Sequence, residues 1–199
     1  MLTVHHLGSS QSERIVWLCE ELELPYQLVR YERDPVTHAA PPEYKALHAF
    51  GTAPVITDGD LVLAESGAIV EYLCRRYAGD RFILGRDHPD FVNYLYWFHF
   101  ANGSMIPSFM VDAVARKPVP SPSRSERALQ MIEDRLGRAS FFAGEEFTAA
   151  DIMMCLLRFF ARREIATYPH VEAYLKRLAQ RPGCRRAMAK AEPDLPALS

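Results

Sequence analysis

Residues 46–73 read ALHAFGTAPVITDGDLVLAESGAIVEYL, and this stretch decides the fold of the N-terminal part of the chain. Residues 54–57 have the composition of a short strand, and Asp58-Gly59-Asp60 is a turn signal between two apolar runs, which indicates a β-hairpin. Residues 61–64 form the returning strand. Residues 66–77 then place apolar side chains at helical spacing, which predicts an amphipathic helix behind the hairpin.

The residues before this stretch alternate between strand and helix patterns. Residues 2–6 are predicted to form a strand, 12–22 an amphipathic helix that ends before Pro25, and 26–31 a second strand. A polar segment with prolines follows. The order strand, helix, strand, variable segment, strand, strand, helix predicts a small mixed sheet covered by helices, and we assign it to a domain at 1–80.

Strand signals end after a glycine-containing linker at 78–87. Residues 89–115 are a long aromatic-rich helical run, and Pro107 within it predicts a kink or break. Capping patterns begin two later helices, at Ser123 with Glu126 and at Thr148 with Asp151. A further helix is predicted at 169–180, and an irregular tail from Glu192. We therefore expect an α/β domain followed by an all-helical C-terminal domain at 87–199.

Composition excludes several classes of function. The 199 residues carry a formal net charge of -2 with mixed signs, so we expect neither a nucleic-acid partner nor an anionic membrane surface. No segment is apolar for the roughly 18 residues that a membrane span needs. The beginning, MLTVHHLGSS, has no signal-peptide pattern, and a cytoplasmic location is expected.

The cysteines do not form a metal or disulfide pattern. Cys19, Cys74, Cys155 and Cys184 are scattered without a CxxC pair. The first three lie in apolar helical stretches and are expected to be buried as small hydrophobic side chains. Cys184 follows Pro182 and Gly183, and we expect it to be more exposed.

Three stretches together resemble soluble glutathione transferases, of the bacterial and fungal type with a serine-type catalytic loop. They are residues 46–73, residues 5–22 (HHLGSSQSERIVWLCEEL) and residues 147–154 (FTAADIMM). The resemblance implies a thioredoxin-like N-terminal domain that binds glutathione and a helical domain that binds a hydrophobic electrophile. It also implies a homodimer, with glutathione as co-substrate and without a cofactor or metal.

The resemblance assigns the glutathione-binding residues. It implies a cis bond before Pro54, so that the backbone of Ala53 pairs with the cysteinyl part of glutathione as an added strand. Ser66 begins a helix whose free N–H groups and partial positive charge favour a carboxylate. Glu65 beside it suits an ammonium, so the pair matches the zwitterionic γ-glutamyl end.

Ser10 is the candidate catalytic residue, because the order Ser-Gln-x-x-Arg at 10–14 resembles the theta-type loop. A hydroxyl that donates a hydrogen bond to the glutathione sulfur stabilises the thiolate over the thiol. Ser9 and Ser12 are alternative donors. Ser10 and Glu13 also match a capping box, so Ser10 is alternatively a helix cap. Arg14 is expected to have a structural role.

The cation for the glycine carboxylate of glutathione is not evident from the sequence. Relatives often carry Lys two residues before the proline, and here Thr52 occupies that position. Lys45, His38 and His48 are possible substitutes. For the second substrate we expect an apolar pocket lined by Phe98, Ala101, Met105, Ile106 and Phe109, with Leu7 and Gly8 opposite.

Three functions fit these motifs. The first is conjugation, in which the bound thiolate attacks a soft electrophilic carbon of a hydrophobic compound. The second is a glutathione-dependent reduction of disulfides or peroxides. The third is a non-catalytic ligand-binding protein with the same fold.

Overall fold

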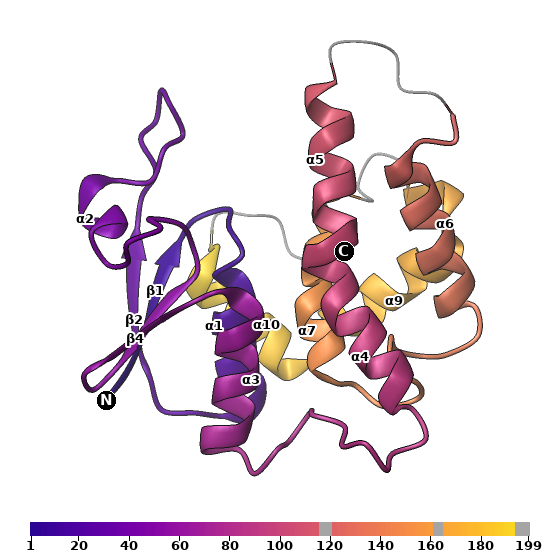
Figure 1. Ribbon diagram of the computed structural model, residues 1–199, viewed down its shortest axis with the longest axis horizontal. Helices are drawn as coiled ribbons and strands as arrows, with labels where there is room; N and C mark the ends of the chain where they lie inside the picture. The colour runs from indigo at the N-terminus through magenta and orange to yellow at the C-terminus, as the bar shows by residue number, and fades with distance from the viewer. Residues whose placement is uncertain (116–120, 161–164, 194–199) are drawn as a thin grey trace. The chain divides into compact units, whose positions relative to one another are not determined.

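The structure, a computed structural model, describes residues 1–115, 121–160 and 165–193, which form two compact units (Figure 1). Unit 1 comprises Met1–Ile83 and the chain from Ala179 on, and unit 2 comprises Leu84–Leu178. The elements of unit 1 are β1 (Leu2–Leu7), α1 (Glu13–Leu22), β2 (Gln27–Tyr31), α2 (Pro42–Lys45), β3 (Val55–Asp58), β4 (Leu61–Ala64), α3 (Ser66–Tyr77) and α10 (Pro182–Ala191). Those of unit 2 are α4 (Phe91–Phe100), η1 (Ala101–Met105), α5 (Ile106–Val114), α6 (Arg124–Leu136), α7 (Ala149–Met153), η2 (Met154–Leu156), α8 (Leu157–Phe160), η4 (Ile165–Thr167) and α9 (Pro169–Ala179).

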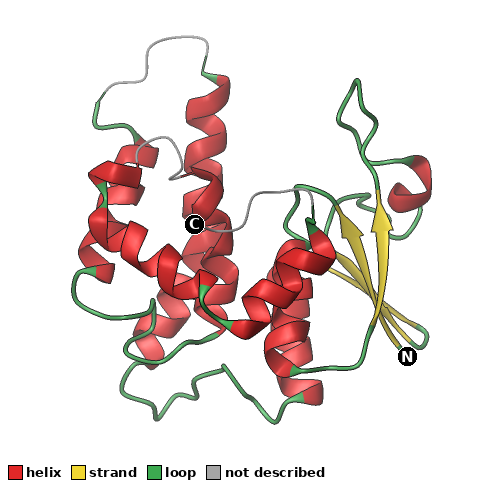
Figure 2. Cartoon of the chain, turned by 180° about the vertical axis from the view of Figure 1, so that it is seen from behind, coloured by secondary structure: helices red, strands yellow, loops and turns green. Residues whose placement is uncertain are grey.

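Unit 1 contains a four-stranded mixed sheet with the order β2-β1-β3-β4. The pair β1 and β2 is parallel, whereas β3 is antiparallel to both β1 and β4. The helices α1, α3 and α10 lie on one side of the strands, which Figure 2 shows in yellow. Fully buried apolar side chains fill the space between the sheet and α1 and α3: Val4, Ile15, Leu18, Ile56, Ile69, Val70 and Leu73. The predicted element order and the thioredoxin-like arrangement are confirmed.

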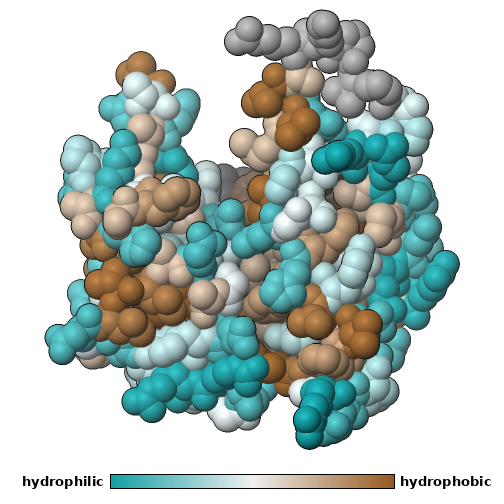
Figure 3. All heavy atoms as spheres, viewed as in Figure 1, coloured by the Kyte–Doolittle hydropathy of each residue, from teal (hydrophilic) through white to brown (hydrophobic). Residues whose placement is uncertain are grey.

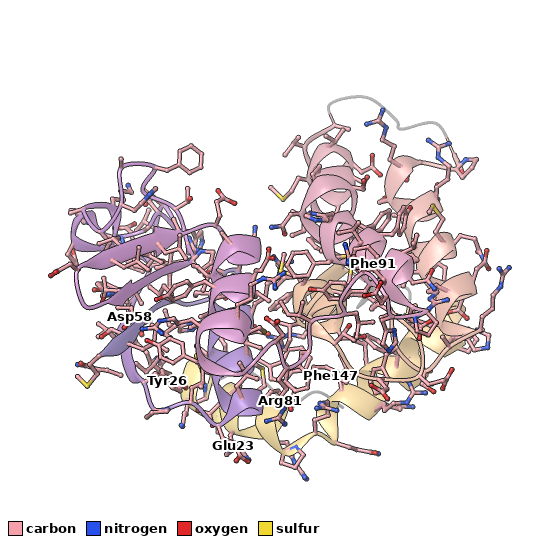
Figure 4. The ribbon with its side chains drawn as sticks, turned by 60° about the horizontal axis from the view of Figure 1, so that its bottom comes forward. Glu23, Tyr26, Asp58, Arg81, Phe91 and Phe147 are labelled. Atoms are coloured by element: carbon pink, nitrogen blue, oxygen red, sulfur yellow. The ribbon has the colours of Figure 1, made fainter. Side chains whose placement is uncertain are left out.

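The helix α10 was not predicted, and it belongs to unit 1 because it packs along α1. Buried carboxylates of α1 hold it. Glu21 accepts two hydrogen bonds from Arg181, at 2.9 and 2.8 Å, and Glu20 pairs with Arg186 at 3.0 Å and Lys190 at 2.5 Å. Glu20 also accepts a hydrogen bond from the hydroxyl of Tyr26, labelled in Figure 4. The helical unit therefore ends earlier than the predicted 87–199, at Leu178.

The packing of α10 on α1 also accounts for the burial of Cys184. All four cysteines are free and buried. Burial of Cys19, Cys74 and Cys155 was predicted, but the expected exposure of Cys184 is wrong, since only 2% of its surface is accessible. Cys184 lies in the first turn of α10, and α10 packs against α1.

A methyl group at Gly183 is predicted to destabilise unit 1. A Cβ there would lie 2.6 Å from the Cδ atom of Glu21, whose carboxylate is held by Arg181 and by the indole N–H of Trp17 at 2.9 Å. Glu21 can move aside only by giving up these bonds, so Gly183→Ala should lower the free energy of unfolding by roughly 1–3 kcal/mol. Gly85→Ala is the control, because a Cβ at Gly85 would have no neighbour within 4 Å. Equal unfolding free energies for both variants in urea would contradict this packing.

The long helical run of unit 2, in which a kink or break was predicted at Pro107, changes to a π-helical turn just before that residue. It divides into α4 and α5 around η1, a π-helical turn over Ala101–Met105. The N–H of Ile106 donates to the carbonyl of Ala101, a five-residue span that accommodates the missing N–H of Pro107. In the part of the chain that the structure describes, no helix has the length and apolar character to cross a membrane.

Both predicted capping boxes are confirmed. Ser123 and Glu126 cap α6, and Thr148 and Asp151 cap α7. The second box extends into the core of unit 2. Asp151 is fully buried and accepts hydrogen bonds from the backbone N–H of Phe142 at 3.0 Å and from the hydroxyl of Tyr174 at 3.0 Å, besides those of Thr148. Burial raises the pKa of Asp151 to about 6.

Candidate functional site

The strand register brings the predicted site residues to one edge of the sheet. His5 lies opposite Val55, and Val55 lies opposite Ala64, in two antiparallel pairings. The end of β1, the beginning of β3 and the end of β4 therefore meet at the same edge. Since β2 runs parallel to β1, β2 also ends at this edge, with Tyr31 as its last residue. The loops at 8–12, 32–41, 52–54 and 65–66 thus meet at this edge, and Asp58, labelled in Figure 4, marks the opposite end of the hairpin.

The Ala53–Pro54 step begins β3. The peptide bond between them is cis, as predicted. Pro54 is buried, and Ala53 packs against a small cluster formed by Leu7, Tyr44 and Val55. This cluster fixes the backbone of Ala53 beside the end of β1.

Glu65 and Ser66 form the junction between β4 and α3. Glu65 is exposed and has φ 70° and ψ 113°, a conformation that costs a residue with a side chain about 1–3 kcal/mol. Ser66 is the first residue of α3 and is buried. The junction therefore presents a carboxylate directly beside a helix N-terminus.

A buried arginine links this junction to α1. Arg14 donates a hydrogen bond to the hydroxyl of Ser66 at 2.9 Å and another to the side-chain oxygen of Gln11 at 2.7 Å. The Ser66 hydroxyl donates to the same Gln11 oxygen at 3.0 Å. The structural role expected for Arg14 is therefore observed, and its positive charge lies directly behind Ser66.

Ser10 is not the N-cap residue of α1. The N-cap residue is Ser12, and its side chain makes no capping hydrogen bond to the helix. The Ser10 hydroxyl instead lies 2.8 Å from the Ser12 hydroxyl and accepts a hydrogen bond from the Ser12 N–H at 3.2 Å. Ser10 is half-buried. Its hydroxyl accepts the N–H two residues later, as a capping residue does, but in the turn that precedes α1, so the capping alternative stays a prediction.

The two rival serines have different surroundings. Ser12 is fully buried, and its hydroxyl contacts both the N–H and the carbonyl of Leu7, at 3.1 and 3.2 Å. Ser9 is exposed, has φ 52°, and donates its backbone N–H to Glu192 at 2.7 Å. The arrangement favours Ser10 over Ser12, whose hydroxyl is committed to the interior.

The candidate cations lie on exposed segments beside this edge. Thr52, Lys45 and His38 are exposed, and His48 is half-buried. Lys45 ends α2, and its Cβ lies against Gly51, where an added Cβ would be 3.6 Å away. His38 has φ 56°, another left-handed residue at this edge.

Arg33 was missed by the sequence analysis. It donates to the carbonyl of Gly8 at 2.7 Å, to that of His38 at 2.9 Å and to that of Ser9 at 3.4 Å. It thus ties the loop at 8–12 to the loop after β2. Its only sequence signal is a charged residue in a polar segment, which is too common to single out.

The residues expected to line the second-substrate pocket on the helical side differ in exposure. Phe98, Ala101 and Met105 are buried, whereas Ile106 and Phe109 are half-buried. Phe109 stacks on Phe160 with ring centroids 4.4 Å apart. Their role toward a ligand stays a prediction.

Comparisons with known proteins identify the family. Residues 1–75 match the family "Glutathione S-transferase, N-terminal domain", and residues 122–182 match "Glutathione S-transferase, C-terminal domain". The chain is 33% identical to Glutathione S-transferase 3 of Schizosaccharomyces pombe, over 96% of this chain and 88% of that protein. It is 26% identical to Glutathione S-transferase 1 of Saccharomyces cerevisiae, over 88% of this chain and 89% of that protein.

Solved structures agree. A crystal structure of a glutathione S-transferase from Actinobacillus pleuropneumoniae superposes with a TM-score of 0.89 at 34% identity, covering 96% of this chain and 93% of that one. A theta-class glutathione S-transferase from Xanthomonas axonopodis pv. citri, solved with glutathione bound, gives a TM-score of 0.72 at 25% identity, over 96% of this chain and 98% of that one. The chain belongs to the glutathione S-transferase family.

Proposed function

We propose that this protein is a glutathione transferase, which binds glutathione along the sheet edge described above and conjugates its thiolate to hydrophobic electrophiles. The observation that carries the proposal is the convergence of the Ala53–Pro54 step, the Glu65–Ser66 junction and the Ser10 loop at this edge. Glutathione is the co-substrate, and the reaction requires no other group.

The chemistry of each group suits one part of the tripeptide. The carboxylate of the γ-glutamyl end is accepted by the N-terminus of α3 and by Ser66, with the charge of Arg14 behind it. The ammonium pairs with the exposed carboxylate of Glu65. The cysteinyl part adds to the sheet through the backbone of Ala53.

The thiol is then activated by Ser10. A thiol with a pKa near 8.5 is mostly neutral at pH 7, and each unit of depression requires about 1.4 kcal/mol in favour of the thiolate. A hydrogen bond from a hydroxyl to a charged sulfur is of this size. At the other end, Lys45 or His38 supplies the cation for the glycine carboxylate, and Thr52 a hydroxyl.

Binding is tested at Glu65. Glu65→Gln should weaken glutathione binding at least about 10-fold, because the ammonium loses its charged partner. Glu71→Gln is the matched control, since Glu71 is an exposed carboxylate of the same helix that pairs with Arg75. Calorimetry that gives equal affinities for wild type and Glu65→Gln would refute the assignment.

The type of reaction is tested by paired assays with an aryl halide and with a mixed disulfide. Burial raises the pKa of Cys74 to about 12 and that of Cys19 further still, so neither thiol is a nucleophile at neutral pH. The reductase alternative therefore works through the thiol of bound glutathione and not through either cysteine. Conjugation predicts turnover of the aryl halide. Faster turnover of the disulfide would favour a glutathione-dependent reductase, and binding without turnover a non-catalytic protein.

The protein is further proposed to work in the cytoplasm as a homodimer, the commonest closed assembly. Large hydrophobic side chains are exposed in both units, among them Val62 on β4 at 44% and Tyr96 on α4 at 47%. Figure 3 shows brown hydrophobic atoms on the surface of each unit. Light scattering at micromolar concentration should give twice the mass of one chain, and a single-chain mass would contradict the dimer.

A further inference from the structure

A chain of polar contacts runs from Ser10 into unit 1 and ends at a carboxylate that follows α10. The Ser10 hydroxyl lies 2.8 Å from the Ser12 hydroxyl, which lies 2.9 Å from Nδ1 of His6. The other ring nitrogen of His6, Nε2, lies 3.3 Å from a carboxylate oxygen of Glu192. The chain is therefore Ser10, Ser12, His6, Glu192, and the mechanism proposed above uses only its first member.

The inner members of this chain are shielded from solvent. Ser12 is fully buried, His6 is 1% exposed, and the Glu192 side chain is 10% exposed. His6 points to the face of the sheet that α1 covers, whereas its neighbour His5 points to the other face and contacts Tyr31 at 3.1 Å. Water therefore does not compete for these hydrogen bonds.

Glu192 is the acid that faces the His6 ring. Its carboxylate and Nε2 are at an ion-pair separation and are not an aligned hydrogen bond. The elements around His6 carry other charged side chains, which are Arg30 on β2, Asp58 on β3, Glu13, Arg14, Glu20 and Glu21 on α1, and Arg185, Arg186 and Lys190 on α10. Arg186 and Lys190 pair with Glu20.

The number of protons on these four side chains determines which of them can donate a hydrogen bond. A hydroxyl has one proton to donate and two lone pairs to accept with. The Ser12 hydroxyl accepts the N–H of Leu7, which uses one lone pair. Nε2 of His6 faces the carboxylate of Glu192 at 3.3 Å, where a proton on Nε2 is favoured over a lone pair, and the arrangements below differ in the proton on Nδ1.

Two arrangements follow. If Nδ1 carries no proton, Ser12 donates to it, and Ser12 keeps a lone pair that Ser10 fills by donating inward. If Nδ1 carries a proton, it donates to Ser12, both lone pairs of Ser12 are occupied, and Ser12 donates its own proton to the carbonyl of Leu7 or to the Ser10 hydroxyl. Ser10 then cannot donate to Ser12, while it still accepts from the Ser12 N–H. Its proton is left for a group outside the loop.

We propose that His6 and Glu192 are positioning residues, which direct the Ser10 hydroxyl proton outward, toward the sulfur of bound glutathione. In the second arrangement Nδ1 of His6 donates to Ser12 while Nε2 faces the carboxylate of Glu192 at 3.3 Å. Glu192 also accepts the backbone N–H of Ser9, so it fixes the loop that carries Ser10. The proposal rests on the proposed function.

The test compares Glu192→Gln with wild type. Glutamine keeps the size of the side chain but lacks the negative charge that faces Nε2 of His6, so Ser12 donates to Nδ1 and the Ser10 hydroxyl turns inward. The pH at which bound thiolate appears, measured by ultraviolet absorbance, should rise by about 1 unit. Affinity for S-methylglutathione, which has no thiol, should change less than about 2-fold.

Two further variants separate positioning from packing. Glu21→Gln weakens the attachment of α10 through Arg181 without changing the contacts of Ser10, Ser12, His6 or Glu192. The pH at which bound thiolate appears in this variant should match wild type. His6→Asn places an amide N–H near the position of Nδ1, so it should restore the low-pH thiolate when combined with Glu192→Gln. An unchanged thiolate titration in Glu192→Gln, or an equal shift of that titration in Glu21→Gln, would overturn the positioning role proposed for His6 and Glu192. Failure of wild type to bind glutathione at all would instead overturn the proposed function.

Discussion

Ser10→Ala is expected to lower the conjugation of an aryl halide by about 10- to 100-fold at neutral pH. The variant loses one hydrogen bond to a charged sulfur, about 1.5–3 kcal/mol, and a loss of this size in the transition state gives such a rate factor. Ser10→Ala also removes the acceptor of the Ser12 N–H, so the free energy of unfolding should fall by about 1 kcal/mol, less than the loss in the transition state. The measurements are kcat, the ultraviolet titration of bound thiolate and a melting curve.

Ser9→Ala is the matched control for this prediction. Ser9 contacts Glu192 through its backbone N–H, which alanine retains, so rate and titration should stay near wild type. If Ser10→Ala melts at a lower temperature but has an unmoved thiolate titration, Ser10 has only a structural role. The donor role would then pass to Ser9 or to a backbone N–H of the loop.

Asp151→Ala is expected to lower the free energy of unfolding by about 3–5 kcal/mol. The change leaves buried donors without an acceptor, namely the N–H groups of Phe142 and Thr148 and the hydroxyl of Tyr174. Glu126→Ala in the other capping box is the control, because Glu126 is exposed and water replaces its contact. Its cost should stay near or below about 1 kcal/mol. Urea unfolding measures both, and equal costs would contradict the buried network.

The contribution of Asp151 to the free energy of unfolding depends on pH, and the sign of this dependence follows from its pKa. Burial raises the pKa of Asp151 to about 6, above the ordinary value of 3.8, so the folded protein takes up this proton at a higher pH than the unfolded chain. Asp151 therefore adds stability as pH falls from about 6 toward about 4, and this contribution is lost as pH rises through 6. The difference in unfolding free energy between wild type and Asp151→Ala should grow as pH falls over this interval. A constant difference would contradict the raised pKa.

Local signals predicted most of the fold. The hairpin around Asp58-Gly59-Asp60, both capping boxes and the interruption of the helix before Pro107 depend on a few neighbouring residues, and the structure has each of them. The convergence of Ala53, Glu65 and the Ser10 loop also follows from element order, because antiparallel pairing of β1, β3 and β4 leaves only one edge for them.

Contacts between distant residues could not be predicted. The helix α10 is short and carries mostly polar and small residues, and it is held by Glu20 and Glu21, which lie about 160 residues earlier in the chain. The burial of Cys184 follows from that packing. Arg33 and Glu192 contact the loop at 8–12 from segments far away in the sequence, and neither belongs to a sequence pattern.

The most direct test of the proposed glutathione site is a crystal structure of the protein with glutathione. It should place the cysteinyl backbone in antiparallel pairing with Ala53, the γ-glutamyl end between Glu65 and Ser66, and the sulfur within hydrogen-bond distance of the Ser10 hydroxyl. Glutathione bound away from this edge of the sheet, or a sulfur that contacts another group and not Ser10, would contradict it.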